Sequence, residues 1–128
     1  MNDEHAIRTA VKAWNTGVDE FVELLAADVE FHAPPGFPDG DLIQGRDAVR
    51  SVLREMFGSV FTGVEYSLED TTRGTGGWLL HARQSVDQQR GMKLEWEEFV
   101  VMRFEGELIS HLWVFYERES AERQAGLS

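Results

Sequence analysis

Glu98 is the one carboxylate among the alternate residues of segment 94–104, which would all point to the same side of a strand. This otherwise apolar row consists of Leu94, Trp96, Glu98, Val100, Met102 and Phe104. If it faces a pocket, burial would raise the pKa of Glu98 and let it act as a general base or acid near neutral pH. Alternatively Phe99 and Val101 point inward, and Glu98 lies on an outer surface or pairs with a basic neighbour. Glu95 and Glu97 are expected to be solvated.

Three further side chains could complete acid–base chemistry around Glu98. His81 and Arg83 share one face of the preceding apolar stretch and are predicted as its catalytic partners. Either of them, or Tyr66, could donate a hydrogen bond to a developing oxyanion. Neighbouring antiparallel strands bring such side chains together only in one register, and the sequence does not define it. The alternative is an exposed polar face.

The remaining titratable residues give weaker signals. His32 and His111 could shuttle protons near neutrality, or could be ordinary surface or structural histidines. No pair of histidines has the His-Glu-x-x-His spacing of a metal site, so no metal is predicted. Nucleophile elbows, phosphate-binding loops and dinucleotide fingerprints are also missing from the sequence, and no cofactor is predicted.

Aromatic residues recur in nearly every predicted element. They include Trp14, Phe31, Phe37, Tyr66, Trp78, Trp96, Trp113, Phe115 and Tyr116. Most must belong to an ordinary core. Tryptophans, however, are bulky, rarely fully buried, and common where one end of a site stays polar. We therefore predict a pocket for a flat or ring-shaped apolar ligand.

The spacing of apolar residues predicts the elements that hold these side chains. Helical spacing indicates helices near residues 7–14, 19–25 and 49–57, and alternation indicates strands at 28–32, 64–68, 78–86, 94–104 and 109–116. Residues 34–40 contain all three prolines and should form a loop. A short polar helix over residues 117–124 should stop at Gly126. This order predicts an α+β domain whose helices cover one face of a sheet.

Length and composition narrow the possible partners. The chain has 128 residues, of which 42% are hydrophobic and 27% charged, so one globular domain over residues 1–128 is expected. A formal charge of -11 argues against nucleic acid and anionic membranes as partners. There is no cysteine, no long apolar stretch and no basic leader before Asp3 and Glu4, so we predict a cytoplasmic protein.

Several local strings follow one another in a recognisable order. These strings are Ala13-Trp14-Asn15-Thr16-Gly17, Asp28-Val29-Glu30-Phe31-His32-Ala33-Pro34, Gly45-Arg46-Asp47-Ala48-Val49, Arg90-Gly91-Met92, Tyr116-Glu117-Arg118 and Ala125-Gly126-Leu127. Taken together they resemble the SnoaL-like family of small polyketide cyclase-like and ketosteroid isomerase-like proteins. Each string is common alone, and their order and spacing carry the resemblance, which spans nearly the whole chain.

The resemblance implies a cystatin-like, cone-shaped α+β barrel. Three N-terminal helices would pack on a strongly curved mixed or antiparallel sheet that encloses a pocket, commonly with a homodimer through the outer sheet face. Relatives place Trp14, Phe31, Trp96, Glu98 and Val114 in the pocket wall. The fold serves cyclases, isomerases, epoxide hydrolases, dehydratases and ligand-binding domains, so it does not define one activity.

We expect a cofactor-independent acid–base enzyme of the isomerase, hydratase or cyclase type that acts on a small hydrophobic cyclic molecule. A non-catalytic small-molecule-binding or dimerisation domain is the alternative. Cyclases of this family use a carboxylate late in the sheet, where this chain has Leu112, Val114 and Tyr116. Cyclase activity itself is therefore the least expected.

Overall fold

The computed structural model describes residues 3–34, 41–57, 61–88 and 91–127. Its elements are α1 (Asp3–Thr16), α2 (Val18–Val22), β1 (Leu25–His32), β2 (Leu42–Gln44), α3 (Arg46–Glu55), β3 (Phe61–Gly74), β4 (Gly77–Gln88), β5 (Lys93–Glu105), β6 (Leu108–Phe115) and α4 (Arg118–Ala125). The predicted α+β class and the three N-terminal helices are confirmed. Most of the predicted loop, residues 35–40, lies outside the described residues.

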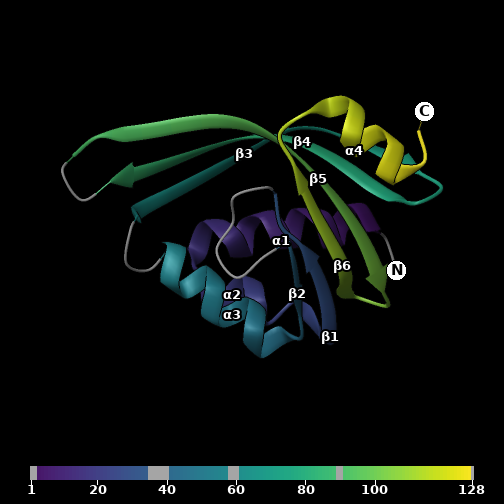
Figure 1. Ribbon diagram of the computed structural model, residues 1–128, viewed down its shortest axis with the longest axis horizontal. Coiled ribbons are helices and arrows are strands. Elements are labelled where there is room, and N and C mark those ends of the chain that lie inside the picture. Colours follow the sequence, from purple (N-terminus) through teal and green to yellow (C-terminus); the bar gives the residue numbers. More distant parts are fainter. Residues whose placement is uncertain (1–2, 35–40, 58–60, 89–90, 128) are drawn as a thin grey trace.

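One six-stranded sheet runs through the molecule in the order β2-β1-β6-β5-β4-β3. Neighbouring strands are antiparallel except β1 and β6, which are parallel, so the sheet is mixed. It bends strongly over α1, α2 and α3, and α4 lies on its convex side (Figure 1). We call the concave side the inner face and the convex side the outer face.

Apolar side chains fill two separate cores because both faces of the sheet are covered. The larger core joins the inner face to the helices and includes Ile7, Val49, Leu53, Leu80 and Val100. The smaller one lies under α4 and contains Leu79, Phe99, Val101, Trp113, Ala121 and Ala125. In α3, Val49, Val52 and Leu53 are buried, as the helical spacing predicts.

Two details differ from the prediction. The second helix ends at Val22, and Leu25 begins β1 because its backbone pairs with Ile109 of β6. The short strand β2 was not predicted; its three residues pair with Glu30, Phe31 and His32 of β1. Three residues are too few to show an alternating pattern.

The turn between β3 and β4 meets the end of α4 at very short range. The Gly76 amide donates to the carbonyl oxygen of Ala125 at 2.8 Å, and a Cβ atom on Gly74 would overlap that carbonyl group. Gly126 ends α4 with a φ of 78°, in the left-handed region that glycine tolerates best. The glycine-rich turn is therefore required by its contact with α4.

Candidate functional site

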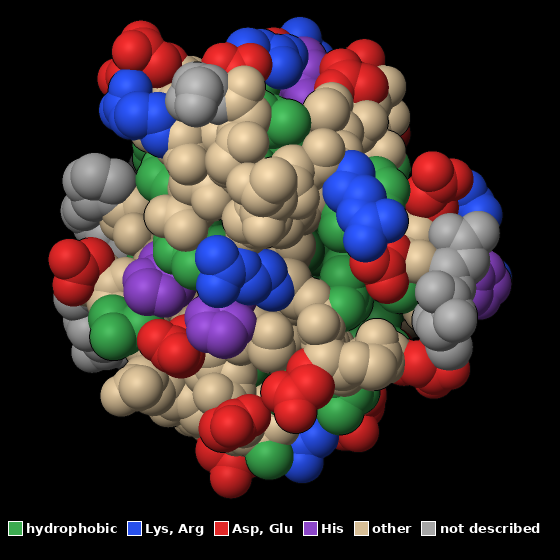
Figure 2. Space-filling model, turned by 90° about the vertical axis from the view of Figure 1, so that its right-hand side faces the viewer, with side chains coloured by type: hydrophobic (Ala, Val, Ile, Leu, Met, Phe, Trp, Pro, Cys, Tyr) green, Lys and Arg blue, Asp and Glu red, His purple; other side chains and the backbone are tan. Residues whose placement is uncertain are grey.

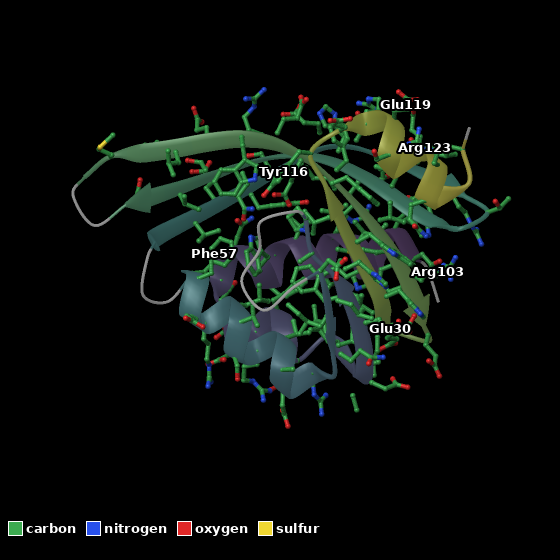
Figure 3. All side chains as sticks on the ribbon, viewed as in Figure 1. Glu30, Phe57, Arg103, Tyr116, Glu119 and Arg123 are labelled. Carbon is green, nitrogen blue, oxygen red and sulfur yellow. The ribbon has the colours of Figure 1, made fainter. Side chains whose placement is uncertain are left out.

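A cavity of about 430 Å³ lies between the inner face of the sheet and the helices. Its wall is formed by Ala10, Val11, Trp14, Phe21, Phe31, Pro34, Leu53, Met56, Phe57, Tyr66, Gln84, Trp96, Glu98, Val100, Met102, Leu112, Val114 and Tyr116. Figure 3 shows Phe57 approaching from the helical side and Tyr116 from the sheet. Such a mostly apolar concavity with a few polar groups is typical of small-molecule sites.

Glu98 lies in the cavity wall with only 6% of its surface exposed. It is paired with Ala82 across β4 and β5, and its side chain is on the inner face with Trp96 and Val100. One oxygen, Oε1, accepts hydrogen bonds from Trp96 Nε1 at 2.8 Å and Gln84 Nε2 at 3.0 Å. No described residue donates to the other oxygen, Oε2.

Gln84 links the carboxylate to the helical layer. The indole Nε1 of Trp14 on α1 donates to Gln84 Oε1, so the other end of the amide must be the donor toward Glu98. All buried polar side-chain atoms in the described part of the chain have partners, so the unpaired Glu98 Oε2 must have access to the cavity. The site thus fixes one carboxylate oxygen and leaves the other available to a ligand.

The electrostatic environment favours a proton on this carboxyl group. Burial raises the pKa of Glu98, and the hydrogen bonds from Trp96 and Gln84 offset part of this rise. No lysine, arginine or histidine is among the described residues of the cavity wall. Because Oε1 already accepts two N–H groups, a proton on Glu98 would sit on Oε2.

Two tyrosines share the cavity with Glu98. Burial, and secondly the charge of Glu98, raises the pKa of Tyr66 well above its ordinary value and also raises that of Tyr116. Both hydroxyls therefore stay protonated and can donate hydrogen bonds. Asn15 on α1 holds the Tyr66 backbone through two hydrogen bonds, of 2.6 and 2.9 Å. Within the described structure the Tyr66 hydroxyl has no partner.

The structure brings together six of the eight predicted site residues. Those in the cavity wall are Trp14, Phe31, Tyr66, Trp96, Glu98 and Val114. His81 and Arg83 are paired with Phe99 and Glu97, on the outer face, so the predicted cluster of His81 and Arg83 with Glu98 is not formed. Instead His81 contacts Glu97 at 2.9 Å and Asp70 at 3.3 Å. The register of β4 against β5 determines that His81 and Arg83 lie on the face opposite to Glu98.

The other two candidate histidines also lie on the outer face. His32 and His111 both stack on Trp113, and His111 Nε2 lies 3.2 Å from Glu30. Arg103 covers the same Trp113 ring, with its guanidinium 5.1 Å from the ring centre. Figure 2 shows histidine, basic and acidic side chains gathered on this side of the molecule. Neither histidine reaches the cavity.

Gln84 is the important site residue that the sequence analysis missed. It shares its face of β4 with Trp78, Leu80 and Ala82, so it is a polar residue in an apolar row. That is the same signal that singled out Glu98. Tyr116, the residue that follows β6, was predicted only as one of many aromatic residues, yet it borders the cavity.

Comparison with known proteins agrees with this fold. A family model described as a SnoaL-like domain matches residues 7–112. No curated protein matches the chain. No described helix has both the length and the apolar character needed to cross a membrane.

Solved structures resemble the chain over nearly its whole length. An NTF2-like protein of unknown function from Burkholderia pseudomallei has a TM-score of 0.78 at 16% identity, covering 98% of both chains. A ketosteroid isomerase-like protein from Catenulispora acidiphila, in complex with trimethylamine, has a TM-score of 0.73 at 18% identity, covering 96% of this chain and 93% of that one.

A Mycobacterium tuberculosis protein in complex with estradiol-17beta-hemisuccinate also has a TM-score of 0.73. It is 17% identical, and the match covers 89% of this chain and 92% of that one. At these identities the structural likeness shows the fold alone. The family model covers most of the sequence, and this chain belongs to the SnoaL-like domain family.

Proposed function

We propose that the chain is a cofactor-independent acid–base enzyme that acts on a small hydrophobic cyclic molecule held in the cavity, with Glu98 as the proton-transferring group. One observation carries the proposal: Glu98 is buried, has no basic partner among the described residues, and keeps one carboxylate oxygen free toward the cavity. A raised pKa brings a carboxyl group closer to the neutral range in which a general base is most effective.

The geometry suits proton abstraction from a carbon next to a ring carbonyl. Ionised Oε2 of Glu98 would take the proton, and the electron pair of the broken C–H bond would form a C=C bond as the carbonyl oxygen gains negative charge. The free Tyr66 hydroxyl, which remains protonated, would donate a hydrogen bond to that oxygen. Return of the proton to another ring carbon would complete an isomerisation.

The cavity wall supports the choice of a hydrophobic ring as substrate. Seven of the described lining residues are aromatic: Trp14, Phe21, Phe31, Phe57, Tyr66, Trp96 and Tyr116. Flat rings pack well against such side chains. The solved structure in complex with estradiol-17beta-hemisuccinate also supports binding of a small hydrophobic molecule.

Exchange of carbon-bound hydrogen tests this function before the natural substrate is known. β-Tetralone, a bicyclic ketone with acidic ring protons, is incubated with the protein in deuterium oxide, and proton NMR follows the loss of those signals. Glu98→Gln should slow protein-catalysed exchange about a hundredfold or more. Glu95→Gln removes the same charge from an exposed position of β5 and should leave the rate unchanged.

Two results would count against catalysis. If Glu98→Gln exchanges as fast as the unmodified protein, Glu98 is not the base. If β-tetralone binds without any accelerated exchange, the non-catalytic binding domain becomes the better account.

We also propose a homodimer through the part of the outer face that α4 leaves open. His32 and His111 lie there over the buried ring of Trp113, and Glu30 and Arg103 provide complementary charges for a second copy. Sedimentation equilibrium should give twice the mass of one chain, and His111→Glu should reduce it to one by adding negative charge beside Glu30. A monomeric unmodified protein would refute the dimer.

A further inference from the structure

We propose that the molecule bound in the cavity carries a positive charge on an amine or iminium nitrogen, and that this nitrogen pairs with the free oxygen of Glu98. The inference rests on the proposed function, since it uses the same cavity and the same carboxylate. The proposed function does not specify the charge of the ligand, and this inference does.

The first argument is that Glu98 has no positively charged partner in the part of the chain that the structure describes. Two carboxylates on the surface have basic neighbours: Asp19 contacts Arg54 at 2.8 Å, and Glu97 contacts His81. Glu98 is more deeply buried than either, yet it is held only by the neutral N–H groups of Trp96 and Gln84. Buried charges are normally paired, so a cationic ligand would supply what the fold omits.

The second argument comes from the rings around the carboxylate. Trp14 and Trp96 donate their N–H groups into the network of Gln84 and Glu98, and both line the cavity. Tyr66 and Tyr116 also line it. Aromatic faces attract cations, most strongly away from water. A cation at Glu98 would thus meet aromatic rings as well as a carboxylate.

The third argument is the charge of the whole molecule. The formal charge is -11, and the described residues of the cavity wall include no basic side chain that would repel a cation. A negative field raises the local concentration of positively charged ligands and disfavours anions. Carboxylate-bearing and phosphate-bearing molecules are therefore poor candidates.

A cationic ligand also suits the proton transfer. If the ligand is a cyclic iminium ion, Oε2 of Glu98 takes a proton from the carbon next to the C=N bond. The electrons of that C–H bond form a C=C bond, and the C=N π electrons move to nitrogen. The products are a neutral enamine and a neutral carboxyl group, so both charges disappear within an apolar cavity. The reverse step returns the proton.

The opposite hypothesis is a neutral ligand to which protonated Glu98 donates a hydrogen bond. The two hypotheses differ in the sign of their pH dependence. A cation prefers ionised Glu98, so its affinity should rise with pH and its binding should release a proton. A neutral acceptor prefers protonated Glu98, so its affinity should fall with pH.

Isothermal titration calorimetry with two matched probes distinguishes them. Benzyltrimethylammonium is a permanent cation that cannot itself titrate, and neopentylbenzene is its neutral isostere with carbon in place of nitrogen. Each is titrated into the intact chain, Glu98→Gln and Glu95→Gln, at a series of pH values that rises from the ordinary 4.5 of a glutamate, because burial shifts the pKa of Glu98 upward. Glu95→Gln controls for the loss of one negative charge.

We expect the unmodified protein and Glu95→Gln to bind the cation about tenfold or more tightly than the isostere at the upper pH, because the cation is attracted by the ionised carboxylate and by the aromatic rings around it. Glu98→Gln should lose this preference and its pH dependence. Equal binding of both probes, or a preference that survives in Glu98→Gln, would overturn the inference but leave the proposed function standing. If neither probe binds while the protein still catalyses hydrogen exchange in β-tetralone, the inference of a cationic ligand is wrong and the proposed function stands. If β-tetralone shows no catalysed exchange either, both the inference and the proposed function are wrong.

Discussion

Glu97 and Glu98 are neighbours in β5, yet the two faces of the sheet give them opposite properties. On the outer face a hydrogen bond from His81 lowers the pKa of Glu97, with Arg83 and Arg118 adding to the effect. On the inner face burial raises the pKa of Glu98. Successive side chains of a strand point to opposite faces of the sheet. Glu97 therefore lies at the surface beside basic residues, whereas Glu98 lies in the cavity wall without a described basic partner. Sequence proximity therefore says little about chemical role in a strand.

The packing of the two faces differs in the same way. Phe99 is 2% exposed and lies in the filled core beneath α4, where Arg118 covers its ring. The inner face instead leaves a cavity of about 430 Å³ beside Glu98. Closely packed side chains stabilise the folded protein, whereas the side chains that line the cavity lack packing contacts on one side, which a ligand could provide. The outer face thus contributes mainly stability, and the inner face provides room for binding.

The largest expected effect is on the outer core. Phe99→Ala should lower the free energy of unfolding by about 3–5 kcal/mol, because it removes a fully packed ring. Phe57→Ala, in the cavity wall, should cost less than about 2 kcal/mol, because that ring already borders empty space. Urea unfolding of both variants measures the difference, and equal losses would show that the two faces are packed alike.

The next effect is a gain in stability from removing the buried charge. The raised pKa means that folded Glu98 binds its proton more tightly than the unfolded chain does, so stability falls as pH rises through the raised value. Glu98→Gln should therefore raise the free energy of unfolding by on the order of 1 kcal/mol at pH values above it. Below the ordinary 4.5 the gain should vanish. If Glu98→Gln still raises the free energy of unfolding at low pH, the increase comes from packing and not from the buried charge.

A direct titration should separate the two glutamates. Carboxyl-carbon NMR should place Glu97 below the ordinary 4.5 and Glu98 above it. Glu97→Gln and Glu98→Gln assign the two signals. By linkage, Glu97 contributes stability above its unfolded pKa, and this is lost as pH falls through its lowered value, the reverse of Glu98. An unshifted Glu98 would remove the acid–base candidate.

The smallest effect is expected from His81→Gln. The pKa of Glu97 should return toward 4.5 because its main hydrogen bond is lost, while that of Glu98 should not move. Thermal unfolding should change little, since an ion pair in contact with water contributes little. A shift in the Glu98 titration would show that the two faces communicate through the sheet.

Much of the fold could be predicted because its signals are local. The stripe of Val49, Val52 and Leu53 identifies α3, and alternation identifies β5 and groups Glu98 with Trp96. Helical and strand periods need only a window of about a dozen residues to be recognised. The family resemblance added the bent sheet and the position of the helices.

The remaining features depend on distant parts of the chain. The positions of His81 and Arg83 follow from the pairing of β4 with β5, which no local pattern encodes. α4 buries only Ala121 and Ala125, too little apolar surface to indicate that it would cover the outer face. Gln84 could have been found by applying to β4 the alternation test that identified Glu98 on β5.

The hydrogen bond from Trp96 to Glu98 gives the molecule a built-in optical reporter. The Trp96 indole donates directly to the carboxylate oxygen, and Trp14 is connected to the same group through Gln84. Gain or loss of a proton at Glu98, or the arrival of a ligand, changes the electric field at these indoles. The intrinsic fluorescence of the unlabelled protein should therefore follow occupancy of the cavity in real time.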